Sequence, residues 1–280
     1  MSLVREIERS LARQRRRQER DSYPELRLST MTHVAWVPSR WLDAAKATLA
    51  GLEERHPART ILLVPEPGRK DGVEATAVVH DFAAGGGREV LSEVIEVRLR
   101  GRVAQHPASV VLPLLVSDLP VFCRWRGEPD WGGNAFGELT SLADRLVVDS
   151  AEWKSLVAAA PDLRRQFERL AVSDIAYLRS LGWRARLAEA WPGVRSVTRV
   201  EIHGPEAEAL LVAGWLRSRL RRRIELTHRR ADRIRAIRLD GEALRPPTGK
   251  RPAGSDLLSE ELETLGRDPV YEAAVGRLGR

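Results

Sequence analysis

The chain has 280 residues, of which 43% are hydrophobic and 30% charged, a composition typical of globular proteins. No apolar run approaches the roughly 18 residues of a bilayer span, and Met1 to Arg20 lack the apolar core of a signal peptide, so we expect a cytoplasmic protein without membrane contact. Cys123 is the only cysteine, which excludes an intramolecular disulfide, a CxxC redox pair and a cysteine-rich zinc site.

The net charge of +7 is concentrated in two stretches of the chain. Residues 1–20 carry seven Arg against three Glu, and residues 215–250 carry twelve Lys or Arg against four acidic residues. Clustered cations bind nucleic acid through its phosphates. A nucleic-acid-binding protein that uses the Arg-rich 217–238 region and the N-terminal arm is therefore the alternative function to be weighed.

The first half of the chain alternates strand-like and helix-like patterns, which indicates an α/β architecture. The expected helices are Leu3–Arg20, with Leu3, Ile7 and Leu11 on one stripe, Trp41–Glu54, Val103–Ser117 and Phe136–Ala143. The expected strands are Thr32–Val37, Arg59–Val64, Glu74–Phe82, Glu89–Arg100, Leu119–Trp125 and Arg145–Val148.

The second half begins with more helix. We expect helices over Trp153–Arg169, Asp174–Trp191 and Pro205–Leu220, and a strand over Val194–His203. A hairpin of Ile224–Arg230 with Arg233–Leu239 should follow, with a turn at Arg238–Gly241 into a third short piece. The chain should end with a linker over Arg245–Gly254 and a last helix over Leu257–Leu278. The fold class is therefore α/β, with two mixed α/β domains, an N-terminal helical arm and a tethered C-terminal helix. The expected ranges are 1–25 for the arm, 26–165 and 166–244 for the domains, and 245–280 for linker and helix.

Motifs of enzymes are weak or absent. Gly85-Gly86-Gly87 joins two strands instead of leading from a strand into a helix, which favours a hairpin loop over a phosphate site. The six histidines form no HExxH or HxH pattern, so no metal site is expected. Asp149-Ser150 could pair an acid with a nucleophile, but helix capping explains both better. We expect no catalytic residues and no cofactor; a sugar-phosphate or nucleotide enzyme is a third alternative that would need the glycine loop to hold phosphate.

Eight Trp stand against four Phe and three Tyr, and Trp is enriched both in cores and at binding hot spots. Arg179, Trp183 and Arg186 share one helix face at i, i+4 and i+7. That face is a candidate interface. The alternative, in which Trp183 packs into the core and its neighbours extend to solvent, stays open at this point.

Several spaced phrases together resemble the OpcA family of glucose-6-phosphate dehydrogenase assembly proteins. In order along roughly residues 30–275 they are His56-Pro57 with Arg59; Pro113-Leu114-Leu115 with Asp118-Leu119-Pro120 and Trp125; Ala143-Asp144-Arg145 with Asp149-Ser150; Asp174 through Arg179 with Trp183-Arg184; and Ala213-Gly214-Trp215-Leu216. Residues Leu258 to Tyr271 are similar to the C-terminal helix of many members. Tyr177 and Arg124 depart from the pattern, since the family commonly has Trp at both positions.

The resemblance implies a non-catalytic assembly factor or allosteric activator that binds glucose-6-phosphate dehydrogenase and supports NADPH supply by the oxidative pentose phosphate pathway. The positions that it marks as partner-binding or motif-scaffold residues are Asp118, Pro120, Trp125, Asp149, Ser150, Asp174, Arg179, Trp183 and Arg184. Some photosynthetic relatives are linked to thioredoxin-dependent control. With Cys123 alone, an intramolecular thiol switch cannot operate here.

Overall fold

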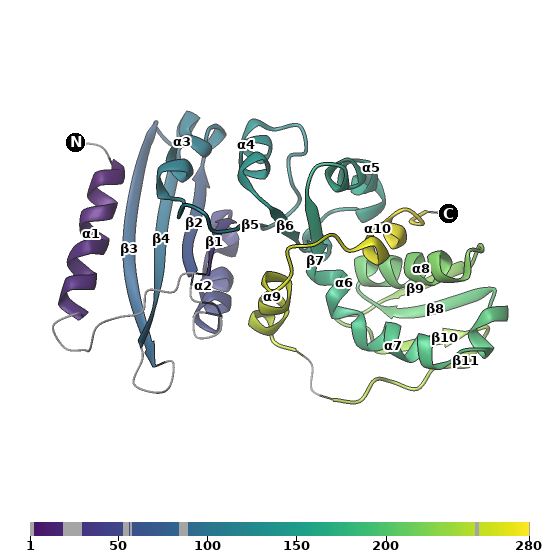
Figure 1. Cartoon of the computed structure of the whole chain (residues 1–280). Coiled ribbons are helices and arrows are strands. Elements are labelled where there is room, and N and C mark those ends of the chain that lie inside the picture. The colour runs from purple at the N-terminus through teal and green to yellow at the C-terminus, as the bar shows by residue number, and fades with distance from the viewer. Residues whose placement is uncertain are drawn as a thin grey trace. The chain divides into compact units, whose positions relative to one another are not determined.

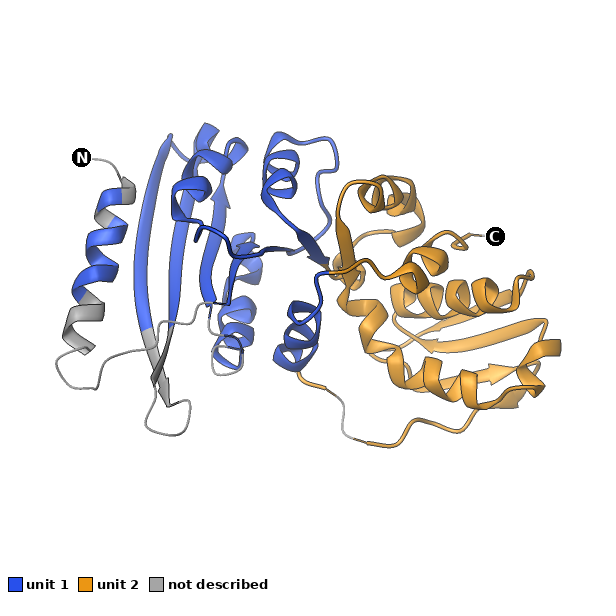
Figure 2. Cartoon of the chain, viewed as in Figure 1, with its two compact units in different colours: residues 1–147, 254–265 blue, residues 148–253, 266–280 orange. Residues whose placement is uncertain are grey.

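The computed structural model of the chain describes residues 3–18, 30–52, 56, 58–83, 89–249 and 252–279. The Gly85–Gly87 loop, Lys250 and part of the N-terminal arm lie outside these residues. By their contacts the residues form two units, residues 1–147 with 254–265 and residues 148–253 with 266–280 (Figure 2). None of the helices in the described part of the chain is long and apolar enough to cross a membrane.

Unit 1 is built on a mixed sheet whose strands follow the order β3-β4-β2-β1-β5-β6 (Figure 1). The strands are β1 (Met31–Trp36), β2 (Ala58–Glu66), β3 (Gly72–Ala83), β4 (Glu89–Arg100), β5 (Val121–Trp125) and β6 (Arg145–Val148). Only β3 and β4 pair antiparallel; the other neighbours run parallel. Every residue of β1 and β5 is buried, as expected for central strands with both faces covered.

The helices of unit 1 are α1 (Leu3–Gln18), α2 (Leu42–Ala50), α3 (Ala108–Val111), α4 (Asn134–Leu142) and α9 (Gly254–Leu262). Helix α1 packs on β3 and buries Ile7 and Leu11, which confirms that part of the expected stripe. The single helix expected over residues 103–117 was wrong. The chain forms two 3₁₀ turns around the short α3, because Pro113 cannot donate a backbone hydrogen bond and clashes with the preceding helical turn.

Stacked aromatic rings form part of the core of unit 1. Trp36 of β1 stacks on Trp125 of β5 with 4.8 Å between ring centroids, and Phe136 of α4 meets Trp125 edge-on at 5.1 Å. Both contacts are geometries that aromatic pairs favour. Trp125 is 4% exposed and therefore holds α4 against the sheet.

A buried histidine lies in the middle of the same sheet. His33 of β1 is 1% exposed, and neither of its ring nitrogens has a hydrogen-bond partner among the described residues. Burial, with smaller contributions from the charges of Arg124 and His56, lowers the pKa of His33 to about 4. The folded protein therefore keeps this ring neutral at pH values where an unfolded chain would protonate it.

Acid should destabilise the fold through His33. Between pH 6.5 and pH 4, His33 is protonated in the unfolded chain but neutral in the folded chain. The contribution of neutral His33 to the free energy of unfolding is therefore fully present above pH 6.5 and is lost as the pH falls towards 4. At pH 4.5 the loss should be about 2 to 3 kcal/mol. Urea unfolding of the wild type and His33→Leu at pH 7 and pH 4.5 measures it. An equal loss of stability in both proteins would show that other groups cause the acid sensitivity.

Unit 2 contains a four-stranded sheet of order β11-β10-β8-β9, covered by helices. Its strands are β8 (Arg199–Gly204), β9 (Glu225–Arg230), β10 (Ala236–Leu239) and β11 (Glu242–Ala243), and β7 (Ala171–Asp174) also belongs to the unit. The helices are α5 (Leu156–Phe167), α6 (Ile175–Arg179), α7 (Leu181–Glu189), α8 (Glu206–Leu220) and α10 (Pro269–Val275).

The hairpin expected from β9 and β10 was wrong. Strand β8 lies between them and pairs parallel with β9 and antiparallel with β10. Helix α8 carries the chain from the end of β8 back to the start of β9, which makes the parallel pair possible. The expected turn into a third short piece is confirmed: β10 and β11 pair across Asp240 and Gly241, which both have positive φ.

Two helices expected as continuous are each divided. The segment 174–191 forms α6 and α7, separated at Ser180, and the segment 257–278 forms α9 and α10, separated before Pro269. Helix α9 belongs to unit 1 and α10 to unit 2. The expected domain boundary at 165/166 lies within α5, whereas contacts divide the chain between Val147 and Val148.

Helix α10 packs closely against α8 within unit 2. At Gly214 of α8, a Cβ atom would lie 2.4 Å from the backbone oxygen of Ala274. Tyr271 of α10 is 1% exposed and meets the rings of Phe167 and Tyr177 at 5.6 and 5.0 Å. The absence of a side chain at Gly214 therefore allows the two helix backbones to approach.

Candidate functional site

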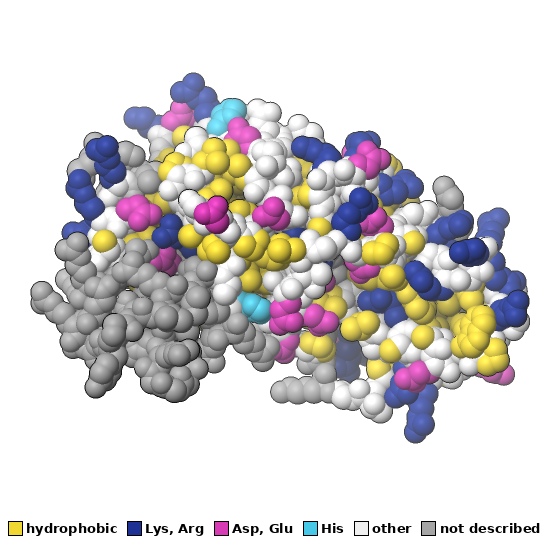
Figure 3. All heavy atoms as spheres, viewed as in Figure 1, with side chains coloured by type: hydrophobic (Ala, Val, Ile, Leu, Met, Phe, Trp, Pro, Cys, Tyr) yellow, Lys and Arg dark blue, Asp and Glu magenta, His cyan; other side chains and the backbone are white. Residues whose placement is uncertain are grey.

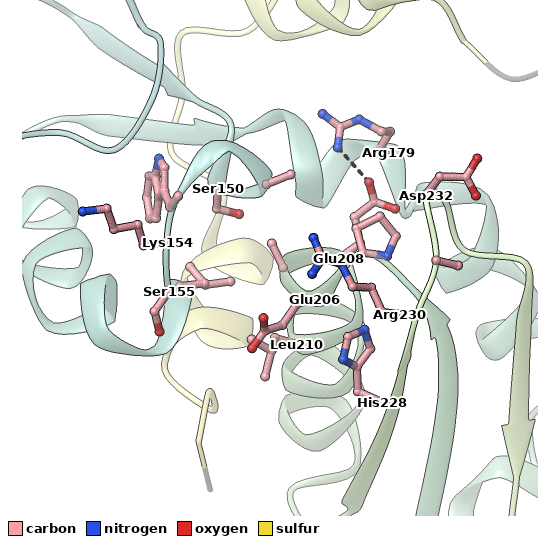
Figure 4. Close-up of a pocket in the computed structure, with 16 residues that line it drawn as sticks. Ser150, Lys154, Ser155, Arg179, Glu206, Glu208, Leu210, His228, Arg230 and Asp232 are labelled. Atoms are coloured by element: carbon pink, nitrogen blue, oxygen red, sulfur yellow. Dashed lines mark hydrogen bonds and ion pairs between the residues drawn. The ribbon is translucent and has the colours of Figure 1, made fainter.

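A cavity of about 780 Å³ opens in unit 2 (Figure 4). Its walls come from residues 150–156, from Arg179 at the end of α6, from the first turns of α8 at 205–210, and from the end of β9 at 228–232. Strands β8 and β9 run parallel, so the end of β8, the start of α8 and the end of β9 meet at one edge of the sheet. In α/β sheets this edge is where ligands commonly bind.

Arg179 connects two acidic side chains beside this cavity. Its guanidinium donates to Glu208 at 2.7 Å and to Asp149, and all three side chains are largely buried. Burial alone would lower the pKa of Arg179, but Asp149 and Glu208 raise it above its ordinary value. The guanidinium therefore stays charged, in contact with two carboxylates.

Asp174 fixes the backbone next to this ion-pair group. Its Oδ1 accepts from the backbone N–H groups of Ser150 at 3.0 Å and Ala176 at 2.9 Å, and the hydroxyl of Tyr271 donates to Oδ2 at 3.3 Å. Burial, and then the charge of Asp149, raises the pKa of Asp174 to about 6. Asp174 thus caps α6 and ties α6, α10 and residue 150 together.

Four of the nine candidate residues come together in unit 2: Asp149, Ser150, Asp174 and Arg179. Of these, Ser150 and Arg179 line the cavity. Asp149 also accepts from the backbone N–H of Ala151 at 3.2 Å, so the expected helix cap is present. Ser150 is 1% exposed and lines the cavity. Its hydroxyl lies beside the carboxylate of Asp174 but forms no hydrogen bond of good geometry with any residue that the structure describes.

Trp183 and Arg184 lie deeper in unit 2. Trp183 is 6% exposed and packs in the hydrophobic core with Leu187, so the core alternative describes its position. The guanidinium of Arg184 lies 3.6 Å from the centre of the Tyr177 ring and donates to the Ser180 hydroxyl at 3.1 Å. Both are scaffold contacts, and a role in binding a partner stays a prediction.

The remaining candidates are in unit 1. Asp118 is exposed at a turn with φ of 63°, and the backbone oxygen of Pro120 accepts from the N–H of Thr32 at 2.9 Å. Trp125 is the core ring described above. Within unit 1, these three residues surround the start and end of β5, and their role as partner-binding residues is untested.

Sequence reasoning missed Glu208, Lys154, Arg230 and His228, which also belong to the cavity. For Glu208, His228 and Arg230 the signal was the succession of strand, Pro205, helix and strand, which is compatible with a crossover between parallel strands. Lys154 lies outside that succession. No group of His, Cys, Asp and Glu side chains that could hold a metal ion occurs among the described residues.

Comparison with known proteins shows the family of the chain. Residues 50–165 match the family model described as glucose-6-phosphate dehydrogenase subunit N-terminal domain, and residues 170–254 match the model for the C-terminal domain. Curated relatives include two proteins named putative OxPP cycle protein OpcA. The one from Nostoc punctiforme is 28% identical over 178 residues and the one from Synechocystis 25% identical over 177, each match covering 59% of this chain.

These matches cover 38% and 37% of the two cyanobacterial proteins, so the chain corresponds to less than half of their length. Neither the family descriptions nor the names of these relatives refer to nucleic acid, so the nucleic-acid alternative gains no support. The family is described as a subunit or assembly protein and not as a catalytic family. The chain belongs to the OpcA family, the family of these glucose-6-phosphate dehydrogenase subunit domains.

Proposed function

We propose that this chain binds glucose-6-phosphate dehydrogenase and favours its assembled, active state without catalysing a reaction itself. The match of both subunit domains, in order over residues 50–254, supports this function most strongly. The names of the two relatives agree with a place in the oxidative pentose phosphate cycle.

The mechanism follows from binding linkage. A partner that binds the active form of the enzyme more tightly than the inactive form shifts the population by that difference in affinity, typically about 1–3 kcal/mol. Lys and Arg side chains are numerous on the face of unit 2 shown in Figure 3. Arg is favoured at protein interfaces, which makes this basic surface the first place to look for the contact.

Purified chain, added to glucose-6-phosphate dehydrogenase from the same organism, should raise enzyme activity and form a co-migrating complex in size-exclusion chromatography with light scattering. From the usual range of coupling we expect activation of about 5- to 150-fold at saturation. The heat-denatured protein is the control and should neither raise the activity nor form the complex. Absence of both activation and complex, with the two proteins folded, would contradict the proposal.

The same titration separates assembly from a conformational effect. If the chain acts by promoting assembly, activation should be largest at dehydrogenase concentrations where the enzyme dissociates, and should vanish where the enzyme alone is fully oligomeric. If the chain acts on the conformation of an intact oligomer, activation should be independent of enzyme concentration.

A further inference from the structure

The cavity of unit 2 has the volume and the position of a small-molecule site. Binding to the dehydrogenase alone does not explain these features. Its volume, about 780 Å³, lies within the roughly 300–1,000 Å³ typical of small-molecule pockets. It lies where parallel strands β8 and β9 end and where α8 begins. The N-terminal end of a helix carries partial positive charge and unpaired N–H groups.

Helix α8 has no capping side chain. Its N-cap residue is Pro205, which cannot supply a side-chain oxygen, and the helix is 15 residues long. Most helices begin with Ser, Thr, Asp or Asn, whose side chain accepts from the first turn. The first turn carries Glu206 and Glu208, of which Glu208 is paired with Arg179. An anion in the cavity can accept from the open N–H groups of this turn, as phosphate groups do at the start of helices in α/β proteins.

Three cationic and three acidic side chains line the cavity, which suits a ligand with both an anionic group and hydrogen-bonding groups. Two of the acidic side chains that line it are already paired: Glu208 with Arg179, and Asp232 with Arg235 at 2.7 Å. Glu206, Lys154 and Arg230 also line the cavity. The Arg230 guanidinium forms no ion pair with any residue that the structure describes.

Ser150 gives an independent sign of a ligand. Its Oγ is buried, has no hydrogen-bond partner among the described residues, and belongs to the cavity wall. Figure 4 shows this hydroxyl pointing towards the space between the labelled side chains. The carboxylate of Asp174 lies beside this hydroxyl without forming a hydrogen bond of good geometry. Buried hydroxyl groups that lack such a bond are costly, so a ligand group or an ordered water that bonds to Ser150 would stabilise the site.

We propose that the cavity binds a small phosphate ester that carries hydroxyl groups, of the sugar phosphate class. Lys154, Arg230 and the start of α8 bind the phosphate. Ser150, Ser155 and the carboxylate of Glu206 bind the hydroxyl groups, which a bare inorganic anion lacks. This chemistry explains why hydroxyl and carboxylate groups stand beside the cations. The site would make the chain responsive to a metabolite in addition to its proposed protein partner.

Isothermal titration calorimetry of the full chain with glucose 6-phosphate, inorganic phosphate and glucose tests the site. Glucose 6-phosphate should bind, inorganic phosphate should bind at least about tenfold more weakly, and glucose should not bind, since it lacks the charge-assisted contacts. Equal affinity for phosphate and glucose 6-phosphate would overturn the assignment to sugar phosphates. No binding of either at millimolar concentration would overturn the site itself.

Variants locate the binding. Arg230→Gln should weaken binding of glucose 6-phosphate by at least about tenfold, whereas Arg169→Gln, which removes an exposed Arg of unit 2 outside the cavity, should leave it unchanged. Ser150→Ala should weaken binding by about fivefold with little loss of melting temperature, because its hydroxyl forms no hydrogen bond of good geometry within the described part of the protein. Unchanged binding in both Arg230→Gln and Ser150→Ala would place the ligand elsewhere and contradict the proposal.

These measurements use the chain alone, without the dehydrogenase. A failure to bind sugar phosphate therefore leaves the proposed activation of the enzyme untouched, and a failure of activation leaves the cavity to be judged by its own titration.

Discussion

Replacement of Arg179 by Met should destabilise the protein by about 3–5 kcal/mol, the usual cost of removing one partner from a buried ion pair. Asp149 and Glu208 are 7% and 3% exposed, so the substitution would leave two buried carboxylates without the cation that both contact. Unfolding in urea, followed by circular dichroism, measures the change.

Two further proteins test whether charge causes the loss. Arg165→Met removes an exposed Arg that pairs with Asp162 in the same unit, and should cost less than about 1 kcal/mol. The triple variant Arg179→Met, Asp149→Asn, Glu208→Gln removes the orphaned charges as well and should recover part of the stability. If the triple variant is no more stable than Arg179→Met, packing and not charge explains the effect.

Replacement of Gly214 by Ala should destabilise the protein by about 2–3 kcal/mol, although Ala is the better helix former by about 1 kcal/mol. The added Cβ would lie 2.4 Å from the backbone oxygen of Ala274, and backbone cannot move aside as a flexible side chain can. Helix α10 must shift away from α8, which loosens the burial of Tyr271 and Val275. Chemical denaturation and hydrogen exchange over 269–275 measure the two effects.

Gly137→Ala is the matched control for that change. Gly137 lies within α4, and nothing lies within 4 Å of the position that its Cβ would take. The same substitution should therefore stabilise the protein by up to about 1 kcal/mol. If both variants gained stability, the contact between α8 and α10 would be looser than the geometry indicates.

Local patterns in the sequence predicted much of the architecture, because burial and alternation depend on neighbouring residues. The strands of unit 1 and the turn at Asp240-Gly241 followed from such patterns. The pairing of β9 did not. The local sequence is compatible both with a hairpin of β9 and β10 and with a parallel crossover from β8 to β9. Only the position of β8 between β9 and β10 distinguishes the two arrangements.

The candidate site was likewise predicted only in part. Asp149, Ser150, Asp174 and Arg179 were found as motif residues, and the structure places them together. Glu208, which completes the ion pairs of Arg179, was not predicted, because its partner lies 29 residues away and no periodicity links them. For Trp183 the helix face was identified, but which side of the helix faces the core depends on its packing against β8 and α8.

The division of the C-terminal segment between the units has a consequence for the evolution of this chain. After residue 253 the chain adds α9 to unit 1 and then α10 to unit 2. A gene fusion or recombination event with one breakpoint could therefore not transfer either unit intact: a break at 147/148 would deprive unit 1 of α9, and a break at 253/254 would deprive unit 2 of α10. Complete separation of the two units would require breaks at 147/148, 253/254 and 265/266.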